Sequence, residues 1–159
     1  MQSITLILDE EGTSQIRRKD SDNIILRKAK LKMLAYKGAF DGLISQREIA
    51  EAKKGLCPKG FEVHHIIPLN CKNTESTIPN MVVIEESAHT WLHNNIYTPA
   101  LMKCKPGQMC IINLPDFDRQ QVLTLAKIQP FIDSYLENQR RIKASVQEMY
   151  RNKNEWYYC

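Results

Sequence analysis

Long apolar runs are missing from this sequence, whose most apolar stretches, such as "CIINL" and "NMVVI", extend over only a few residues. A helix needs about 20 apolar residues to span a bilayer. The first residues, "MQSITLILDEEG", lack the basic start and the cleavage site of a secretory signal. Internal repeats and low-complexity tracts are also missing. These absences argue against a membrane, exported or repeat protein, and we expect a cytoplasmic protein with no membrane partner.

The sequence also lacks any C-x-x-C pair, although it contains five cysteines, Cys57, Cys71, Cys104, Cys110 and Cys159. An odd number of cysteines without this spacing fits neither a disulfide framework nor a zinc ribbon. We therefore expect all five side chains to be reduced thiols, as is usual in the cytoplasm.

What remains is the composition of an ordinary globular protein, with 43% hydrophobic and 25% charged residues in a chain the size of one domain. The net charge of +4 is unevenly distributed. Residues 1–60 carry 12 Lys and Arg against 8 Asp and Glu, residues 61–95 carry 1 against 4, and residues 96–159 carry 9 against 6. Basic flanks around an acidic centre suit a protein that grips a polyanion and holds a cation. Solvated helix faces give the same counts.

Periodicity predicts an α+β fold, a small and mostly helical single domain. Alternating apolar side chains predict a strand at residues 3–8, and the polar stretch at residues 9–14 predicts a turn. Helical spacing over residues 22–38 predicts a basic helix that ends at a glycine. The sequence "SQRE" at residues 45–48 has the spacing of a capping box, so a short helix should follow.

The last part of the chain, residues 97–159, is predicted to be a loop followed by helices. A strand is expected at residues 109–114, between two prolines. Asp116 or Asp118 can cap a helix, and an amphipathic helix continues beyond Pro130. We expect this helix to pack on the domain, with docking of a partner as the alternative.

Four histidines, His64, His65, His89 and His93, all lie within 30 residues of the sequence. His89 and His93 stand four residues apart in "ESAHTWLHNN", so on a helix their rings project from one face and can bind one divalent ion. His64 and His65 lie on a predicted strand, where neighbouring side chains point to opposite faces. One of this pair can complete a three-histidine site, which leaves the other beside the ion as a base.

Two further interpretations of these histidines stay open: scattered core or surface histidines, and a purely structural metal site. The second is weakened because structural sites usually include thiolates. The helical pair reads "HTWLH" and lacks the glutamate of H-E-x-x-H, which argues against a metalloprotease of the zincin type.

The region between the two histidine pairs predicts a strand, loop, strand and helix in that order. "FEVHHII" and "NMVVI" have the composition of strands, and Asn80 stands where the loop turns into the second one. The amide of Asn80 can bond backbone groups on both sides of such a turn. Apolar residues sufficient to pack this unit are Val63, Ile66, Val82, Ile84, Trp91 and Leu92.

"EVHHIIPL", the asparagine in "IPNMVVI" and "HTWLH" together resemble the HNH nuclease motif, also called the ββα-metal finger. In spacing they are most similar to the nuclease domains of the DNA-degrading colicins and pyocins. The resemblance covers residues 61–96 and implies that this finger forms the centre of the domain, between residues 1–60 and 97–159. The loop before the asparagine departs from the family pattern because it lacks paired glycines, and only Cys57 in "CPKG" is similar to a family cysteine knuckle.

The resemblance implies a role for each histidine. His64, His89 and His93 match the metal ligands, and His65 matches the general base that activates water. The implied cofactor is a divalent metal ion, with Mg²⁺ as the working ion and Zn²⁺ or Ni²⁺ able to occupy the site.

Two further residues gain roles from the same resemblance. Asn80 matches the residue that ties the loop between the strands and so holds the base in place. Glu62 matches a carboxylate that orients a substrate-facing arginine, which the sequence does not identify.

The predicted function is therefore a metal-dependent endonuclease that hydrolyses DNA, serving as a toxin, an antiphage defence effector or a nuclease of a mobile element. The alternative is a catalytically weak module that keeps the finger to bind nucleic acid or a partner. RNA is a minor alternative substrate, because no aromatic platform for stacked bases is evident. A free nuclease endangers its host, so a protein inhibitor or a sensor subunit is expected as a partner beside DNA.

Overall fold

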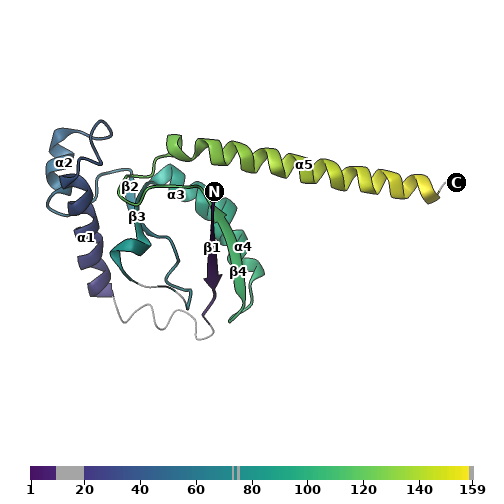
Figure 1. Ribbon diagram of the computed structural model, residues 1–159, viewed down its shortest axis with the longest axis horizontal. Coiled ribbons are helices and arrows are strands. Elements are labelled where there is room, and N and C mark those ends of the chain that lie inside the picture. The colour runs from purple at the N-terminus through teal and green to yellow at the C-terminus, as the bar shows by residue number, and fades with distance from the viewer. Residues whose placement is uncertain (10–19, 73, 75, 158–159) are drawn as a thin grey trace. The chain divides into compact units, whose positions relative to one another are not determined.

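The computed structural model describes residues 1–9, 20–72, 74 and 76–157 of the chain. The chain divides into two compact units, Met1–Leu125 and Ala126–Cys159. The first unit holds two small antiparallel sheets and the shorter helices, and the second consists of a single helix, α5 (Leu125–Tyr157) (Figure 1). The fold class is α+β, as predicted, but the structure separates the C-terminal helix from the unit that carries the histidines.

The histidine pair lies at the end of β2 (Phe61–His65), which forms a two-stranded antiparallel sheet with β3 (Met81–Glu85). Val63 pairs with Val83 at the centre of this sheet. The first four residues of β3 are all buried, which is the burial expected of a strand covered on both faces. The apolar run "MVVI" in the sequence is therefore explained by the burial of both faces of β3.

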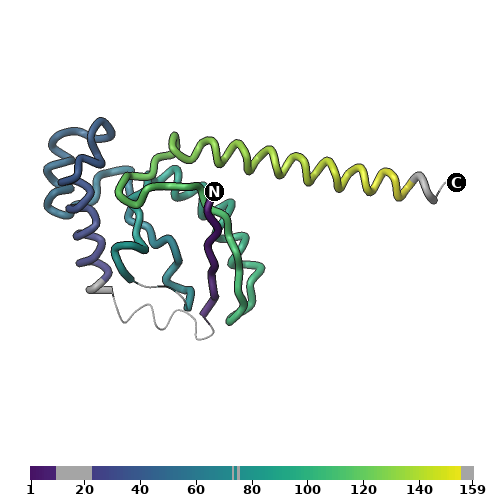
Figure 2. Tube along the Cα trace, in the orientation of Figure 1, coloured from purple at the N-terminus to yellow at the C-terminus, as the bar shows by residue number. Residues whose placement is uncertain are grey.

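A second antiparallel sheet joins β1 (Gln2–Ile7) to β4 (Met109–Leu114), two strands from opposite ends of the first unit (Figure 2). Buried and exposed residues alternate along β4, as they do in a strand with one covered face. Both strands confirm the prediction, although their pairing could not be read from the sequence. Most of the turn predicted at residues 9–14 lies outside the described residues.

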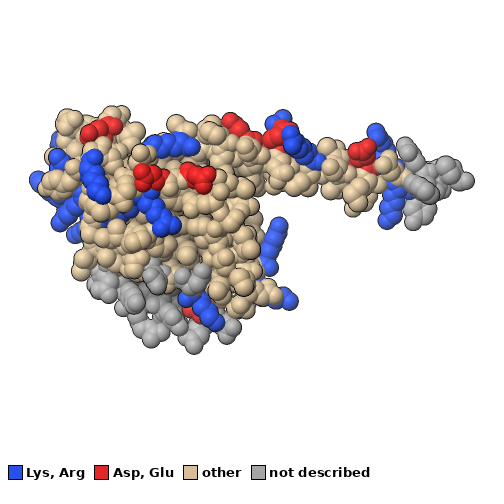
Figure 3. All heavy atoms as spheres, viewed as in Figure 1, with Lys and Arg blue, Asp and Glu red and all other residues tan. Residues whose placement is uncertain are grey.

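Two helices cover the face of the β2–β3 sheet that carries Val63. They are α1 (Asp20–Tyr36) and α2 (Gln46–Ala52), and the core they share with the sheet contains Leu31, Leu34, Ala35, Phe40, Ile49, Ala52, Val63, Met81, Val83 and Val122. Ser45 and Glu48 form the predicted capping box at the start of α2. Figure 3 shows Lys and Arg side chains gathered over this part of the surface.

The chain after β3 is more helical than predicted. The expected helix begins as α3 (Glu86–Leu92), continues as a π-helical turn, η3 (His93–Tyr97), and passes into α4 (Thr98–Lys103). The prediction of a loop directly after residue 96 is therefore wrong. Helical turns follow one another without a break because backbone angles at the junctions stay in the right-handed helical region.

The start of the C-terminal helix also differs from the prediction. Asp118 accepts a hydrogen bond from the Gln120 N–H at 2.8 Å and so caps a turn rather than a helix. Leu123 then pairs with β3, because its N–H donates to Val83 O at 2.8 Å, and this extended segment delays the helix to residue 125. Pro130 lies inside α5 near its start. Although α5 is long, neither it nor any other helix in the described ranges is apolar enough to cross a membrane.

The cysteines depart from the expectation of five separate thiols. Cys104 and Cys110 lie beside each other, with their Cα atoms 6.4 Å apart, and are joined as a disulfide between α4 and β4. Such a separation lies within the range that a disulfide spans. Cys57 and Cys71 are free thiols, as predicted, the first exposed and the second buried. Cys159 lies outside the described residues.

Candidate metal centre

The pleat of β2 separates the two neighbouring histidines. Val63 packs in the core shared with α1 and α2, and His65, two residues further on, belongs to the same face of the strand. His64 belongs to the other face, where its ring centroid lies 4.8 Å from that of His89 and 5.0 Å from that of His93. The prediction that the pair points to opposite faces is confirmed.

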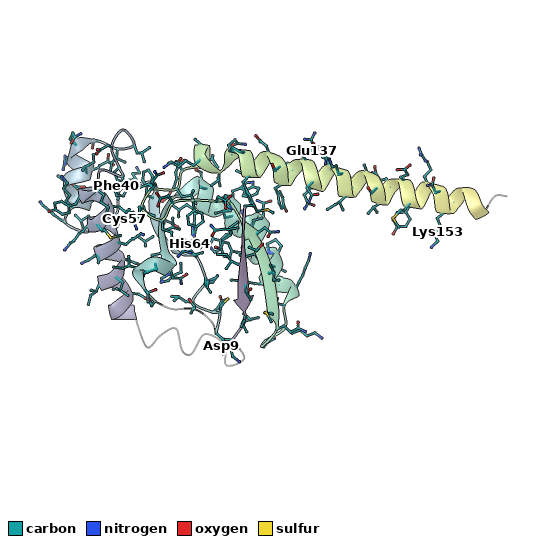
Figure 4. All side chains as sticks on the ribbon, in the orientation of Figure 1. Asp9, Phe40, Cys57, His64, Glu137 and Lys153 are labelled. Carbon is teal, nitrogen blue, oxygen red and sulfur yellow. A yellow bond between two sulfur atoms is a disulfide. The ribbon has the colours of Figure 1, made fainter. Side chains whose placement is uncertain are left out.

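Three imidazole rings converge beside α3. His89 and His93 are one helical turn apart, with ring centroids at 4.4 Å, and His64 reaches them from β2 (Figure 4). Each of the three residues offers one ring nitrogen such that all three atoms lie within 4.8 Å of one another. His64 Nδ1 and His89 Nε2 are 3.1 Å apart. The structure therefore brings together the three residues predicted as ligands.

The spacing of these nitrogens fits a divalent cation. With metal to nitrogen bonds of about 2.0 to 2.1 Å and tetrahedral angles, two ligand atoms lie roughly 3.3 Å apart. The distance between His64 Nδ1 and His89 Nε2, 3.1 Å, is close to that value. Three protein ligands leave a fourth position of a tetrahedral ion free for water or substrate, which is typical of catalytic rather than structural sites.

Glu62 holds one of the ligands in place. It lies two residues before His64 on the same face of β2, and its Oε2 is 2.5 Å from His89 Nδ1. A carboxylate that accepts from one imidazole nitrogen fixes the ring and directs the other nitrogen toward the cation. The structure differs here from the resemblance, because within the described residues Glu62 contacts a histidine and not an arginine.

Tyr97 completes the packing around the cluster. The π-helical turn places it four residues after His93, and the two rings stack with centroids 5.1 Å apart. Its ring is also 5.2 Å from that of His64. The buried hydroxyl donates a hydrogen bond to Ile66 O at 2.7 Å. Tyr97 therefore joins the helical ligands to the end of β2, in a π-helical turn of the kind often found at functional sites.

Burial favours the neutral, cation-binding form of His64 and His93. Loss of hydration lowers the pKa of His64 to about 2, and repulsion from His89 and His93 adds to this shift. Burial also lowers the pKa of His93, helped by His89 and partly offset by Glu62. A neutral imidazole has the free lone pair that a metal ion requires, so His64 and His93 are ready to bind a cation at neutral pH.

Asn80 organises the loop that follows β2. Its Oδ1 accepts from the Ile67 N–H at 2.9 Å, and its Nδ2 donates to Ile67 O at 3.1 Å and to Thr74 Oγ1 at 3.3 Å. Thr74 Oγ1 in turn donates to Ile67 O at 2.8 Å. Asn80 lies directly before β3 and does not line the cavity beside the histidines. It acts on the end of β2 through the loop backbone.

His65 lies in the wall of the same cavity as the histidine cluster. The cavity has a volume of about 650 Å³, and Arg27 and Lys28 of α1 also line it. His65 is 5% exposed, and its Nε2 makes no hydrogen bond within the described part of the chain. Burial lowers the pKa of His65, and the positive charge of Arg27 lowers it further. A neutral imidazole close to cationic side chains is the pattern of a base beside an anion-binding surface.

Sequence reasoning missed three residues of this site. Tyr97 continues the spacing of four from His93, so the helical pattern could have indicated it. Thr74 and Arg27 gave no such signal, because nothing in the local sequence relates either of them to the histidines. Only the packing of α1 beside β2 brings Arg27 into the cavity wall.

We expect the metal-free protein to lose stability as the pH falls below 6.5. His64 takes up a proton near pH 6.5 in the unfolded chain but only near pH 2 in the folded protein, so acid favours unfolding. At about pH 5 the loss from this residue is about 2 kcal/mol, at about 1.4 kcal/mol per pH unit. Urea unfolding in EDTA at neutral and acid pH measures it.

The control for this prediction is His64→Asn, which removes the titrating group. Its free energy of unfolding should fall less between neutral and acid pH, by the same amount of about 2 kcal/mol. Equal acid-induced losses in the two proteins would contradict the assignment of the effect to His64.

Glu62→Gln should weaken metal binding by about 10- to 100-fold, because removal of a carboxylate behind a ligating histidine typically costs that much. Calorimetric titration with Zn²⁺ measures the affinity. Glu86→Gln, which removes an exposed carboxylate in the first turn of α3, is the matched control and should bind as the wild-type protein does. Wild-type affinity in Glu62→Gln would show that the contact with His89 does not orient the ligand.

No family model, no curated protein and no solved structure matches this chain. What the site can do therefore follows from its own residues. These are three imidazoles that converge, a carboxylate that orients one of them, and a separate histidine in the wall of the same cavity.

Proposed function

We propose that this chain is a metal-dependent HNH endonuclease that hydrolyses phosphodiester bonds of DNA. The ββα-metal finger would consist of β2, β3 and α3. His64, His89 and His93 would hold the metal ion, and His65 would be the general base. The observation that carries the proposal is that His65 lines the same cavity as His64, His89 and His93 without belonging to the group of three whose ring nitrogens converge.

The contrast between His64 and His65 favours an enzyme over a binding module. A module that only bound nucleic acid through the finger would need the three ligands and would have no use for the fourth histidine. His65 is buried, and its Nε2 has no hydrogen-bond partner among the described residues. A buried polar atom without a partner costs free energy, and a catalytic role gives a reason for keeping it.

The chemistry divides between the metal ion and the chain. A bound divalent cation, with Mg²⁺ as the expected working ion and Zn²⁺ or Ni²⁺ able to occupy the site, would stabilise negative charge on the phosphate oxygens. The neutral imidazole of His65 accepts a proton from water on a ring nitrogen. The water oxygen then bonds to phosphorus as the bond to the leaving oxygen breaks. The resemblance to HNH nucleases implies a 5′-phosphate and a 3′-hydroxyl as products.

Arg27 and Lys28 would hold the DNA backbone beside the metal ion. Both side chains are exposed, belong to α1 and line the cavity that contains His65. Arg27 is close enough to His64 and His65 to lower the pKa of each. A guanidinium can bind two phosphate oxygens at once, so Arg27 is the better candidate for orienting the phosphate. The resemblance implies a substrate-facing arginine oriented by Glu62. Arg27 would face the substrate in its place, without an ion pair to Glu62.

A nuclease that cuts DNA endangers the cell that makes it, and this limits the biological roles that the enzyme can have. The proposal places the protein in the cytoplasm, as a toxin, an antiphage defence effector or a nuclease of a mobile element. A nuclease in that compartment needs restraint, so a protein inhibitor or a sensor subunit is part of the proposal.

His65→Ala should lower the rate of DNA cleavage by roughly 100- to 10,000-fold, the usual contribution of a general base. Nicking of supercoiled plasmid by the wild-type protein should require Mg²⁺, Mn²⁺, Ni²⁺ or Zn²⁺ and stop in EDTA. The variant should bind Zn²⁺ and DNA as the wild-type protein does, because His65 is not a ligand.

His64→Ala is the contrasting variant, since it removes a ligand and should lose metal binding together with cleavage. Cleavage at the wild-type rate by His65→Ala would rule out its role as the base. A wild-type protein that binds the metal and DNA but cuts nothing would favour the binding module.

Arg27→Ala should weaken DNA binding by about 10- to 100-fold, because it removes a charged hydrogen bond to a phosphate. The slope of log affinity against log salt concentration should also become shallower by about one. Electrophoretic mobility shifts at several salt concentrations measure both effects. Arg47→Ala, in a residue that pairs with Glu51 on α2, is the matched control. Equal effects of the two substitutions would contradict the role of Arg27.

A further inference from the structure

The second unit of the chain consists of α5 alone, so within that unit no other element covers the helix. Its exposed large apolar side chains are Leu136 at 48%, Ile142 at 51%, Val146 at 44%, Met149 at 71% and Tyr150 at 66%. Of these, Ile142, Val146, Met149 and Tyr150 each stand three or four positions from another of the four along the helix and so share one face. Contiguous exposed apolar surface of this kind marks a place where another molecule binds.

Three of these side chains, Ile142, Val146 and Met149, lie on a heptad pattern. Spacings of three and four alternate without interruption through Ile132, Tyr135, Gln139, Ile142, Val146, Met149 and Lys153. This is the a and d series of a coiled coil, with an average period of 3.5 residues. Ile132 is buried, so we define the α5 seam as the exposed members Gln139, Ile142, Val146, Met149 and Lys153. A period of 3.5 indicates a partner that is itself a helix, wound around α5 with a left-handed twist.

We propose that the α5 seam binds the same seam of a second copy of this chain, as a parallel two-stranded coiled coil. This inference does not depend on the proposed nuclease activity, because it concerns the separate helical unit.

The charges of α5 favour a second copy over a different protein. Glu137 binds Arg140 at 2.7 Å and Arg141 at 3.2 Å, and Glu148 lies 4.0 Å from Arg151. These ion pairs lie within one helix and at heptad positions outside the seam. These five charged groups are thus paired within the helix and do not require a partner of opposite charge.

The residues that flank the seam lead to the same conclusion. At heptad positions e and g between residues 136 and 152 stand Leu136, Asn138, Lys143, Ser145, Tyr150 and Asn152. Partner choice in coiled coils is set mainly by charges at these positions. Lys143 is the single charged residue there, and in a parallel pair it faces Asn138 of the other copy. At these flanking positions, therefore, no like charges of two identical helices face each other.

The polar members of the seam determine its register and its end. In a parallel, in-register pair Gln139 faces Gln139, and two side-chain amides can bond to each other. A single polar layer of this type fixes register and strand number. Val146 occupies an a position, where a β-branched residue favours two strands. Lys153 faces its own copy at the next a position and ends the apolar contact, so the seam is short and the dimer should dissociate on dilution.

The test is the oligomeric state of the full chain by sedimentation velocity over about a hundred-fold range of protein concentration. The wild-type protein should shift from monomer to dimer as concentration rises, and its helical circular dichroism signal should rise with it. Val146→Glu places a charge in the seam and should remain monomeric. Ala144→Glu places the same charge on the opposite face of the same exposed helix and should dimerise as the wild-type protein does.

Three outcomes would overturn the proposal. A wild-type protein that stays monomeric at the highest concentration excludes a second copy and leaves the seam to a different protein. Dimerisation of Val146→Glu at the wild-type concentration shows that another surface forms the dimer. A trimer or tetramer excludes the two-stranded pairing. Because both substitutions are at exposed positions of the helix, the circular dichroism of each monomer separates loss of pairing from loss of folding.

Discussion

Adjacent residues of a β-strand point to opposite faces of the sheet. In β2 two adjacent residues, His64 and His65, are both histidines. His64 is sent toward the helix that carries His89 and His93, and His65 toward the face that packs on α1. A slip of one residue in the pairing with β3 would exchange the two faces. The buried side chains of β3 prevent that slip, so packing on both sides of the sheet sustains the separation of ligand and base.

The cluster is stabilised although it buries polar groups. His64 and His65 lose hydration, and each retains an Nε2 without a hydrogen bond in the part of the chain that the structure describes. Contacts made by Glu62 and Tyr97 offset part of this cost, since each holds one side of the cluster to β2. Acidic conditions work against the same arrangement because protonation restores a charge to rings that lack water. The arrangement of histidines that suits a cation therefore lowers the free energy of unfolding of the metal-free protein.

Short-range patterns predicted the parts of this site that a single strand or helix turn can define. The spacing of four between His89 and His93, and the adjacency of His64 and His65, fix relative directions within a few residues. The capping box at Ser45 was predictable for the same reason. The partner of Glu62 was not, because the same two-residue alternation that places it beside His64 does not say which helix covers that face.

The sequence by itself determined the local geometry: which residues form strands, which rings share a helix face, and the heptad spacing along α5. Tertiary structure alone decided what these elements meet. It paired β1 with β4, brought Arg27 into the cavity wall, placed Cys104 beside Cys110 and kept residues 122–124 extended along β3. The physical reason is the distance along the chain over which each effect acts. Backbone geometry fixes directions over one turn or one pleat, whereas contacts between distant segments depend on how the whole core packs.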